Sequence, residues 1–539
     1  MTALPDVRTS RWAALTALVT TSVLLTACGS GGGGSGGGAA APKSGGTLTF
    51  AVGSDAGCVD PQQVASNETI YSVRQIVDSL TDQDPRTGRI VPWLAKSWDV
   101  SSDATTFTFH LRSGVTFSDG SKLTAQVVKD NFDAVPKLGA LGTLAEGYLS
   151  GVKSTTVVDP LTVKVTFDRP NAQFLQATST HSLGIESSAS VKRSPQQKCS
   201  DGVVGSGPFV LKQYVQNQSV TLARRTGYAW GSSRWSKKGE AYLDKLVFKV
   251  VPEAGVRAGS LQSGQVDAIS SVGKANEAAL KGGQVTLLRR ANPGVVFGLG
   301  LNNARPVLKD ARVRRAIASA IGRQQIADTV FPTGTQAATS ILAHTTPDYT
   351  SLAPDLTTDA SKAKSLLNAA GWKIGSDGIR TKGGQKLSLT IDWVPNAGTN
   401  QPALELIQQQ LKAVGVQVSL KQLQVTQLAP TLQSGDYDAA WGNVTRADPD
   451  ILRSSFSTKL ANYYRVPASG LDTVLAAQAA TTDTAKRKQL IGQAQQLIVR
   501  NAYYVPVVEL QTQLGVTKKV HHLDFDASSR LQLHDTWIG

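Results

Sequence analysis

The sequence has few of the residues from which catalytic and metal sites are built. Its 539 residues include three cysteines and six histidines. Outside a Gly/Ser-rich stretch near the N-terminus, it contains no Gly-x-Ser-x-Gly elbow, no His-Glu-x-x-His motif and no Gly-x-x-x-x-Gly-Lys-Ser/Thr phosphate loop. The one adjacent histidine pair, His521 and His522, would point to opposite faces of a strand, which is poor geometry for a metal. We therefore expect no enzyme, no cofactor and no metal site.

The sequence also lacks dense basic runs, although it is basic overall. It has 55 Lys and Arg against 40 Asp and Glu, a formal net charge of +15, and the basic residues are scattered along the chain. Nucleic acid is therefore not expected as a partner. We interpret the charge as attraction to an anionic envelope surface, with anionic cargo as the alternative. With 41% hydrophobic and 18% charged residues, the body has the composition of a globular protein.

Long apolar runs are missing except at the N-terminus. Arg8 and Arg11 precede an apolar run over residues 12–25 that is too short to cross a bilayer comfortably, as is typical of a signal peptide. The run ends in Leu-Thr-Ala-Cys, which resembles a bacterial lipobox. Residues 1–27 are therefore predicted to be a lipoprotein signal peptide, and Cys28 to carry the lipid. The alternative is a buried cysteine behind an apolar helix.

Residues 28–46 are predicted to tether the lipid to the folded body. They are mostly glycine, serine and alanine, which offer no side chains for a core. A coil of this length reaches about 25 Å, so the body can turn near the membrane and meet a partner there. The predicted location is extracytoplasmic, with the lipid holding the protein on the outer face of the cell membrane.

Only two cysteines, Cys58 and Cys199, remain in the body. Outside the cytoplasm, two cysteines pair more often than they stay free, so a disulfide is favoured over two free thiols. A catalytic role is the least favoured interpretation, because no histidine stands at a recognisable spacing from either cysteine.

Residues 92–131 carry the most informative local pattern. Phe107, Phe109 and Leu111 alternate with polar residues, which predicts a half-buried strand, and Thr124 stands where a helix N-cap belongs. From Phe109 the order is Phe-x-Leu-Arg-x-Gly-Val-x-Phe-Ser-Asp-Gly-x-x-Leu-Thr-Ala. This order closely resembles the signature segment of the family 5 solute-binding proteins, the peptide, nickel and oligosaccharide receptors of ABC importers.

The resemblance extends over nearly the whole body, from Gly45 to Trp537. Further matching segments are Gly-Ser-Gly-Pro-Phe at 205–209, Leu-Gln-Ser-Gly-Gln-Val-Asp at 261–267 and Asp-Ala-Arg-Val-Arg-Arg-Ala-Ile at 310–317. It implies an α/β, two-lobed periplasmic-binding-protein-like fold of type II, in the large cluster with an extra subdomain in lobe one and a hinge between the lobes. About 490 residues after the tether also suit two or more lobes.

The expected boundaries follow from the same resemblance. Lobe one is predicted over residues 47–296 plus 509–539, with an inserted subdomain at about 85–200, and lobe two over residues 297–508. In lobe two, a strand at 387–393, a helix capped by Asn400 and a strand from Val416 predict a right-handed crossover with parallel strands. Ligands of such sheets gather beyond the carboxyl ends of the strands, at loops 393–399 and 436–450.

The charged anchors of dipeptide-binding relatives are not kept in these loops. Val394 stands where those relatives place the Arg that holds the ligand carboxylate, and Thr445 where they place the Asp that holds the ammonium. Arg446 and Asp448 can compensate, but the loss disfavours free dipeptides and favours longer peptides, glycans or another polar solute.

Six residues are predicted to contact the ligand. An indole offers apolar surface with one donor, and an Asn amide offers both donor and acceptor, so the lobe-two set suits a neutral polar ligand. The turn of lobe one lets backbone N–H groups approach the ligand. The alternatives are that the tryptophans fill the core and that the turn is only a tight turn. The six are Trp393, Asn396, Trp441 and Asn443 from lobe two, and Ser206 and Gly207 from lobe one.

The sequence thus predicts a lipid-anchored receptor that captures an oligopeptide or similar polar solute and delivers it to the permease subunits of an ABC importer. A glycan or nickel receptor of the same family is the first alternative. A lipid-anchored exported hydrolase would need an activated nucleophile in the cleft, and a receptor that only signals would have no permease genes beside its own.

Overall fold

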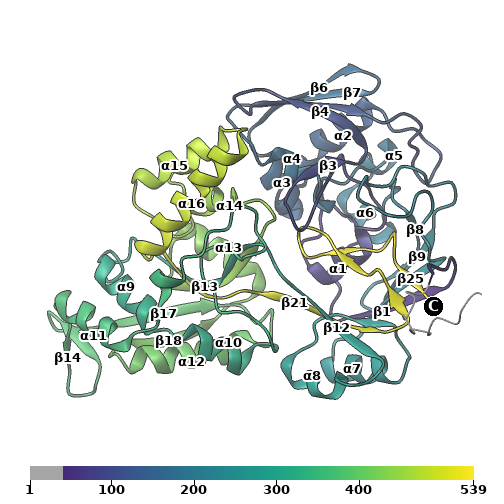
Figure 1. Cartoon of the computed structure of the whole chain (residues 1–539). Coiled ribbons are helices and arrows are strands. Elements are labelled where there is room, and N and C mark those ends of the chain that lie inside the picture. Colours follow the sequence, from purple (N-terminus) through teal and green to yellow (C-terminus); the bar gives the residue numbers. More distant parts are fainter. Residues whose placement is uncertain (1–40) are drawn as a thin grey trace, which may run out of the picture. The chain divides into compact units, whose positions relative to one another are not determined.

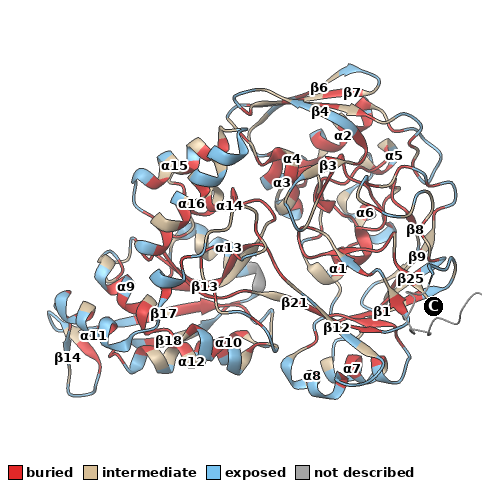
Figure 2. Cartoon of the chain, in the orientation of Figure 1, coloured by how far each residue is buried: buried red, intermediate tan, exposed pale blue. Residues whose placement is uncertain are grey.

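The computed structural model describes residues 41–539, so the predicted signal peptide and Cys28 lie outside the described residues. In the part of the chain that is described, no helix combines the length and apolar character that a membrane crossing needs. Two large mixed sheets organise this part (Figure 1). Buried residues follow both sheets and the inner faces of the helices beside them (Figure 2).

A seven-stranded sheet forms the centre of the first lobe. Strand β1 runs parallel to β10 and β11, and the other pairs are antiparallel. Helix α1 (Asn67–Val73) packs in one core with this sheet, while α7 (Ala254–Gln262) and α8 (Lys274–Leu280) pack in another. The strand order is β12 (Val285–Ala291), β21 (Gln511–Thr517), β11 (Ala268–Ile269), β1 (Thr47–Val52), β10 (Lys245–Val250), β9 (Ser219–Arg224) and β8 (Phe209–Val215).

A four-stranded antiparallel sheet carries the signature segment. In β5 (Thr106–Leu111), the side chains of Phe107, Phe109 and Leu111 are fully buried and the alternating residues are half-buried, as the period of two predicts. Thr124 Oγ1 accepts a hydrogen bond from Val127 N at 3.4 Å and caps α2 (Ala125–Ala134), also as predicted. The other strands are β4 (Ala95–Val100), β7 (Thr162–Phe167) and β6 (Val152–Asp159), and α3 (Thr143–Leu149) precedes β6.

A five-stranded sheet forms the centre of the second lobe. Strand β17 runs parallel to β18 and to β19, which confirms the predicted crossover through α12 (Asn400–Lys412). Helices α9 (Ala311–Ala320), α10 (Arg323–Val330), α11 (Ala360–Ala369) and α12 share one core with the sheet, and α14 (Ile451–Phe456), α15 (Gly470–Ala479) and α16 (Thr484–Arg500) share another. The strand order is β18 (Gln417–Gln422), β17 (Ser388–Trp393), β19 (Ala439–Thr445), β13 (Gly294–Leu301) and β20 (Tyr504–Val508).

Asn400 does not cap α12 as the sequence suggests. The N-cap position is Thr399, and Asn400 is the first residue of the helix. Its amide Nδ2 donates instead to Val394 O at 3.0 Å, and its Oδ1 accepts from Trp441 Nε1 at 3.1 Å. The side chain therefore joins the start of the helix to the residue that follows β17 and to β19, and these contacts satisfy its buried polar atoms.

The chain crosses between the two large sheets twice, from β12 to β13 and from β20 to β21. These crossings lie beside each other. Asn292 N donates to Leu510 O at 2.7 Å, and Thr512 Oγ1 donates to Asn292 Oδ1 at 2.7 Å. A double connection of this kind is the usual site of hinge motion in two-lobed proteins.

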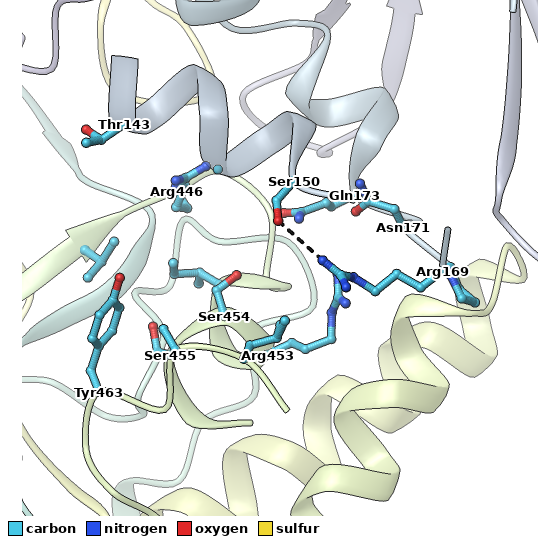
Figure 3. A pocket seen from close by; sticks show the side chains of 16 residues that line it. Thr143, Ser150, Arg169, Asn171, Gln173, Arg446, Arg453, Ser454, Ser455 and Tyr463 are labelled. Carbon is cyan, nitrogen blue, oxygen red and sulfur yellow. Dashed lines mark hydrogen bonds between the residues drawn. The ribbon is translucent and has the colours of Figure 1, made fainter. Parts of the chain in front are cut away.

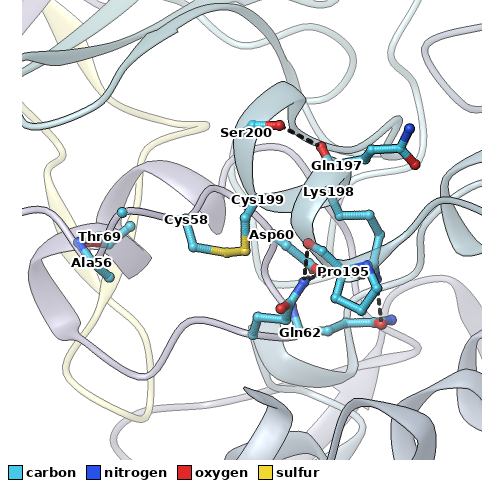
Figure 4. The surroundings of a disulfide bond; sticks show 12 residues. Ala56, Cys58, Asp60, Gln62, Thr69, Pro195, Gln197, Lys198, Cys199 and Ser200 are labelled. Carbon is cyan, nitrogen blue, oxygen red and sulfur yellow. Dashed lines mark hydrogen bonds and ion pairs between the residues drawn. A yellow bond between two sulfur atoms is a disulfide. The ribbon is translucent and has the colours of Figure 1, made fainter.

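Cys58 and Cys199 are joined in a disulfide, next to a buried group of charged residues (Figure 4). Cys58 follows β1, and Cys199 lies in α6 (Pro195–Asp201), so the bond joins segments 141 residues apart. Val59 N also donates to Cys199 O at 3.1 Å. The bond therefore fixes α6 to the loop that follows the first strand.

We expect unreduced protein to yield one peptide that links Cys58 and Cys199 in mass spectrometry. Because the bond closes a long loop of the unfolded chain, its removal in the double variant Cys58→Ala/Cys199→Ala should lower the free energy of unfolding by about 2–4 kcal/mol. Two thiols that alkylate in native, unreduced protein would contradict the pairing.

Candidate functional site

A cavity of about 340 Å³ lies where the first lobe meets the second (Figure 3). One wall belongs to the first lobe, from α3 and the loop that follows β7, and the other to the end of β19 and the segment that follows it in the second lobe. Beside it, Ala172 N donates to Ala479 O at 2.9 Å, so the lobes are in backbone contact. The lining residues are Thr143, Gly147, Ser150, Arg169, Pro170, Asn171, Gln173, Val444, Arg446, Ile451, Arg453, Ser454, Ser455, Leu460, Ala461 and Tyr463.

Arg446 comes from the second lobe and reaches the first. It follows directly on the last residue of β19, and its backbone N donates to Pro293 O at 3.0 Å. Its guanidinium carbon lies 4.1 Å from the ring centroid of Tyr148 in α3, a cation–π contact. The side chain thus forms part of the cavity wall and joins the two lobes at the same point.

The first-lobe wall supplies Arg169, Ser150 and Asn171. Arg169 Nη2 donates to Ser150 Oγ at 3.3 Å, and its Nε lies 3.8 Å from Asp168 Oδ1. The carboxamide Oδ1 of Asn171 is buried and has no hydrogen-bond partner among the described residues. A buried acceptor without a partner is costly, so this atom is a candidate to receive a donor from a ligand.

Arg453 differs from the other two arginines of the cavity because its charge is paired. Its Nε and Nη2 each lie 2.7 Å from a different oxygen of Asp450, a bidentate ion pair. Burial disfavours the charged form of Arg453, but Asp450 outweighs burial and raises the pKa of Arg453 above its ordinary value. Arg453 therefore lines the cavity, but Asp450 already balances most of its charge, so it contributes little to binding a charged ligand.

Asp448 is also committed to a structural pair. Its two oxygens accept from Arg487 Nη2 at 2.6 Å and from Arg487 Nη1 at 3.0 Å, and the carboxylate is buried. Arg487 lies in α16, far along the chain. The idea that Asp448 replaces a lost ligand anchor is therefore not supported, whereas Arg446 does reach the cavity.

None of the six predicted ligand residues lines this cavity. Trp393 and Trp441 are buried in the core of the second lobe, where the Trp441 ring stacks on Phe297 with centroids 5.2 Å apart. Asn396 is exposed and its Oδ1 accepts from Asn400 Nδ2 at 2.8 Å. Asn443 is half-buried in β19 and donates to Thr445 Oγ1 at 3.4 Å.

The two residues of the first-lobe turn pack against their own chain. Ser206 is fully buried, and its Oγ accepts from Asp78 N at 3.3 Å. A Cβ built on Gly207 would lie 2.5 Å from Gln75 O, so this glycine permits a close approach of backbone to backbone. The turn thus has a packing role in the structure, and contact of all six residues with cargo stays a prediction.

Comparison with known proteins decides the family. Residues 89–462, more than half of the chain, match the model of the bacterial extracellular solute-binding proteins, family 5 middle. The chain belongs to this family.

The similarity of this solute-binding protein to its relatives also extends over most of each chain. The dipeptide-binding protein of Escherichia coli is 27% identical over 483 residues, which cover 83% of this chain and 86% of that protein. A periplasmic binding protein DppA from Helicobacter pylori, solved with the peptide STSA, superposes with a TM-score of 0.76 at 23% identity, over 92% of this chain and 98% of that one. NikA from Brucella suis, solved with Fe(III)-EDTA, superposes with a TM-score of 0.79 at 23% identity, over 92% and 100%.

Family membership confirms several predictions. The fold is the two-lobed α/β fold of the periplasmic binding proteins, as expected. The chain is an extracytoplasmic solute-binding protein of the ABC importer type, and its family is not enzymatic. The absence of catalytic motifs in the sequence agrees with this assignment.

No local sequence pattern indicates Arg169, Asn171 and Arg453 as residues of the solute-binding protein's cavity. They come from segments nearly 300 residues apart, and only the tertiary structure brings them together. Arg446 is the exception, because its position in the sequence indicates a role at the site. It stands two residues before Asp448, in the loop where relatives carry a ligand anchor.

Proposed function

We propose that this chain is the lipid-anchored receptor of an ABC importer and that it captures an oligopeptide or similar polar solute in the cavity between its lobes. The cavity supports the proposal, because both lobes line it and hinge closure would enclose a solute there. Binding of dipeptides by the Escherichia coli relative also supports a peptide cargo. Delivery goes to permease subunits at the membrane.

Thermal-shift screening of peptide, oligosaccharide and nickel-chelate pools tests the proposal. A ligand at 100 times its dissociation constant stabilises the folded state by about 2.7 kcal/mol. We expect the peptide pool to give a shift and Ala461→Trp, which fills the cavity from an exposed lining position, to abolish it. The control Ala278→Trp, on the exposed face of α8, should keep the shift. A shift that survives in Ala461→Trp would place the site elsewhere.

The lipid anchor has its own test. Cys28→Ala is expected to move the protein from the membrane fraction to the soluble fraction or to leave it as uncleaved precursor, because two acyl chains supply the firm membrane attachment. Detergent partition of wild type and variant measures the change. Unchanged partition of the variant would refute the lipoprotein assignment while leaving solute binding untouched.

A further inference from the structure

The charged side chains that line the cavity are all of one sign. Three of its sixteen lining residues are arginines, Arg169, Arg446 and Arg453, and none is Asp, Glu, Lys or His. Since Arg453 is neutralised by Asp450, the local excess of positive charge rests on Arg169 and Arg446. The neutral set of Trp and Asn residues expected from the sequence does not describe this wall.

Among the three arginines of the cavity, Arg446 is the one whose charge has no carboxylate partner among the described residues. No carboxylate among the described residues lies within ion-pair distance of it, and its buried Nε has no hydrogen-bond partner there. The face of Tyr148 holds the guanidinium in place and leaves its donors unused. A guanidinium with free donors matches a carboxylate, which accepts two parallel N–H groups.

Arg169 adds a second, weaker positive charge. Its neighbour Asp168 is 3.8 Å away, and the side chains of both residues are about half exposed, so this pair contributes little. Asn171 lines the same cavity, the residue is only 4% exposed, and its Oδ1 has no hydrogen-bond partner among the described residues. The wall therefore offers cations and neutral hydrogen-bonding groups, and no anion for a positively charged ligand group.

We propose that the cavity selects acidic peptides, with Arg446 binding a carboxylate and Asn171 Oδ1 accepting an amide N–H of the same solute. This inference rests on the proposed function and specifies its cargo. Arg169, on the first-lobe wall, would hold a second carboxylate of the solute. The net charge of +15 favours the approach of such anionic solutes as well.

Three tripeptides of matched length, acetylated at the N-terminus and amidated at the C-terminus so that the Glu side chain is the only carboxylate, test the selection by calorimetry: Ala-Glu-Ala, Ala-Gln-Ala and Ala-Lys-Ala. We expect Ala-Glu-Ala to bind roughly 10-fold to 100-fold more tightly than Ala-Gln-Ala, the range of one charge-assisted hydrogen-bonded pair, and Ala-Lys-Ala to bind most weakly. In Arg446→Gln the preference for Glu over Gln should shrink to less than about 3-fold, while the exposed-site control Arg86→Gln should keep it. The melting temperature of each unliganded variant checks the fold.

Each outcome has one meaning. Equal binding of the Glu and Lys peptides, or a preference that persists in Arg446→Gln, overturns the inference and leaves the peptide receptor in place. If no tripeptide binds, the dianion glutarate is compared with its diamide. Binding of glutarate alone keeps the anion selection and removes the peptide cargo, whereas no binding of either overturns the inference together with the proposed site.

Discussion

Lys198→Met is expected to lower the free energy of unfolding by about 3–5 kcal/mol at neutral pH, because it leaves buried carboxylates without their cation. Lys198 Nζ lies 2.9 Å from Asp60 Oδ2 and 3.3 Å from Glu186 Oε2. All three side chains are at most 3% exposed. Chemical denaturation of wild type and variant measures the difference.

The effect of Lys198→Met should depend on pH. Burial, followed by the charge of Asp60, raises the pKa of Glu186 well above its ordinary value, and Lys198 opposes both. A carboxyl whose pKa is raised by folding binds its proton more tightly in the folded state, so its contribution to stability falls as pH rises above the ordinary value of 4.5. Without the lysine this penalty grows, so the variant should lose less stability at pH 5 than at pH 7.

Lys192→Met is the matched control. Lys192 is exposed and follows α5 (Ser188–Val191), a few residues before Lys198 in the chain, so its replacement should change stability by less than about 0.5 kcal/mol. A loss in Lys198→Met that equals that of the control, or that does not diminish at pH 5, would show that the cluster is not an obligatory ion network.

The sequence predicts those parts of this protein that local pattern determines. The period of two in β5 and the cap at Thr124 follow from neighbouring residues alone, and the strand, helix and strand of β17, α12 and β18 follow from spacing and handedness. Pairings such as Asp448 with Arg487 and Lys198 with Asp60 join segments 39 or more residues apart, so no local pattern indicates them.

The residues that line the cavity were harder to predict for a related reason. The segment from Ala439 was expected to form a loop, but strand β19 continues to Thr445, so Trp441 lies inside a central strand. A large apolar side chain in such a strand gains more from burial against the helices than from a solvent-filled cleft. The positions that reach the cavity begin only where the strand ends, at Val444 and Arg446.

Trp441→Ala is therefore expected to destabilise the protein by about 3–5 kcal/mol, the usual cost of replacing a buried tryptophan with alanine. The side chain is 1% exposed, stacks on Phe297 and donates its Nε1–H to Asn400 Oδ1 at 3.1 Å. Its removal leaves a cavity in the core and deprives Asn400, which anchors the start of α12, of one partner. Equilibrium unfolding in urea measures the loss.

Trp441→Phe separates packing from the hydrogen bond. Phenylalanine keeps a ring against Phe297 but has no N–H for Asn400. We therefore expect a loss of about 1–2 kcal/mol in the free energy of unfolding, which is smaller than the loss in Trp441→Ala. If cargo binds in the cavity, both variants should bind peptides normally at temperatures where they remain folded, since Trp441 does not line it, whereas the cargo contact expected from the sequence implies a loss of binding. If Trp441→Ala instead keeps its melting temperature within a few degrees and loses the ligand-induced shift, the indole contacts cargo, and the binding site extends from the cavity into the core of the second lobe.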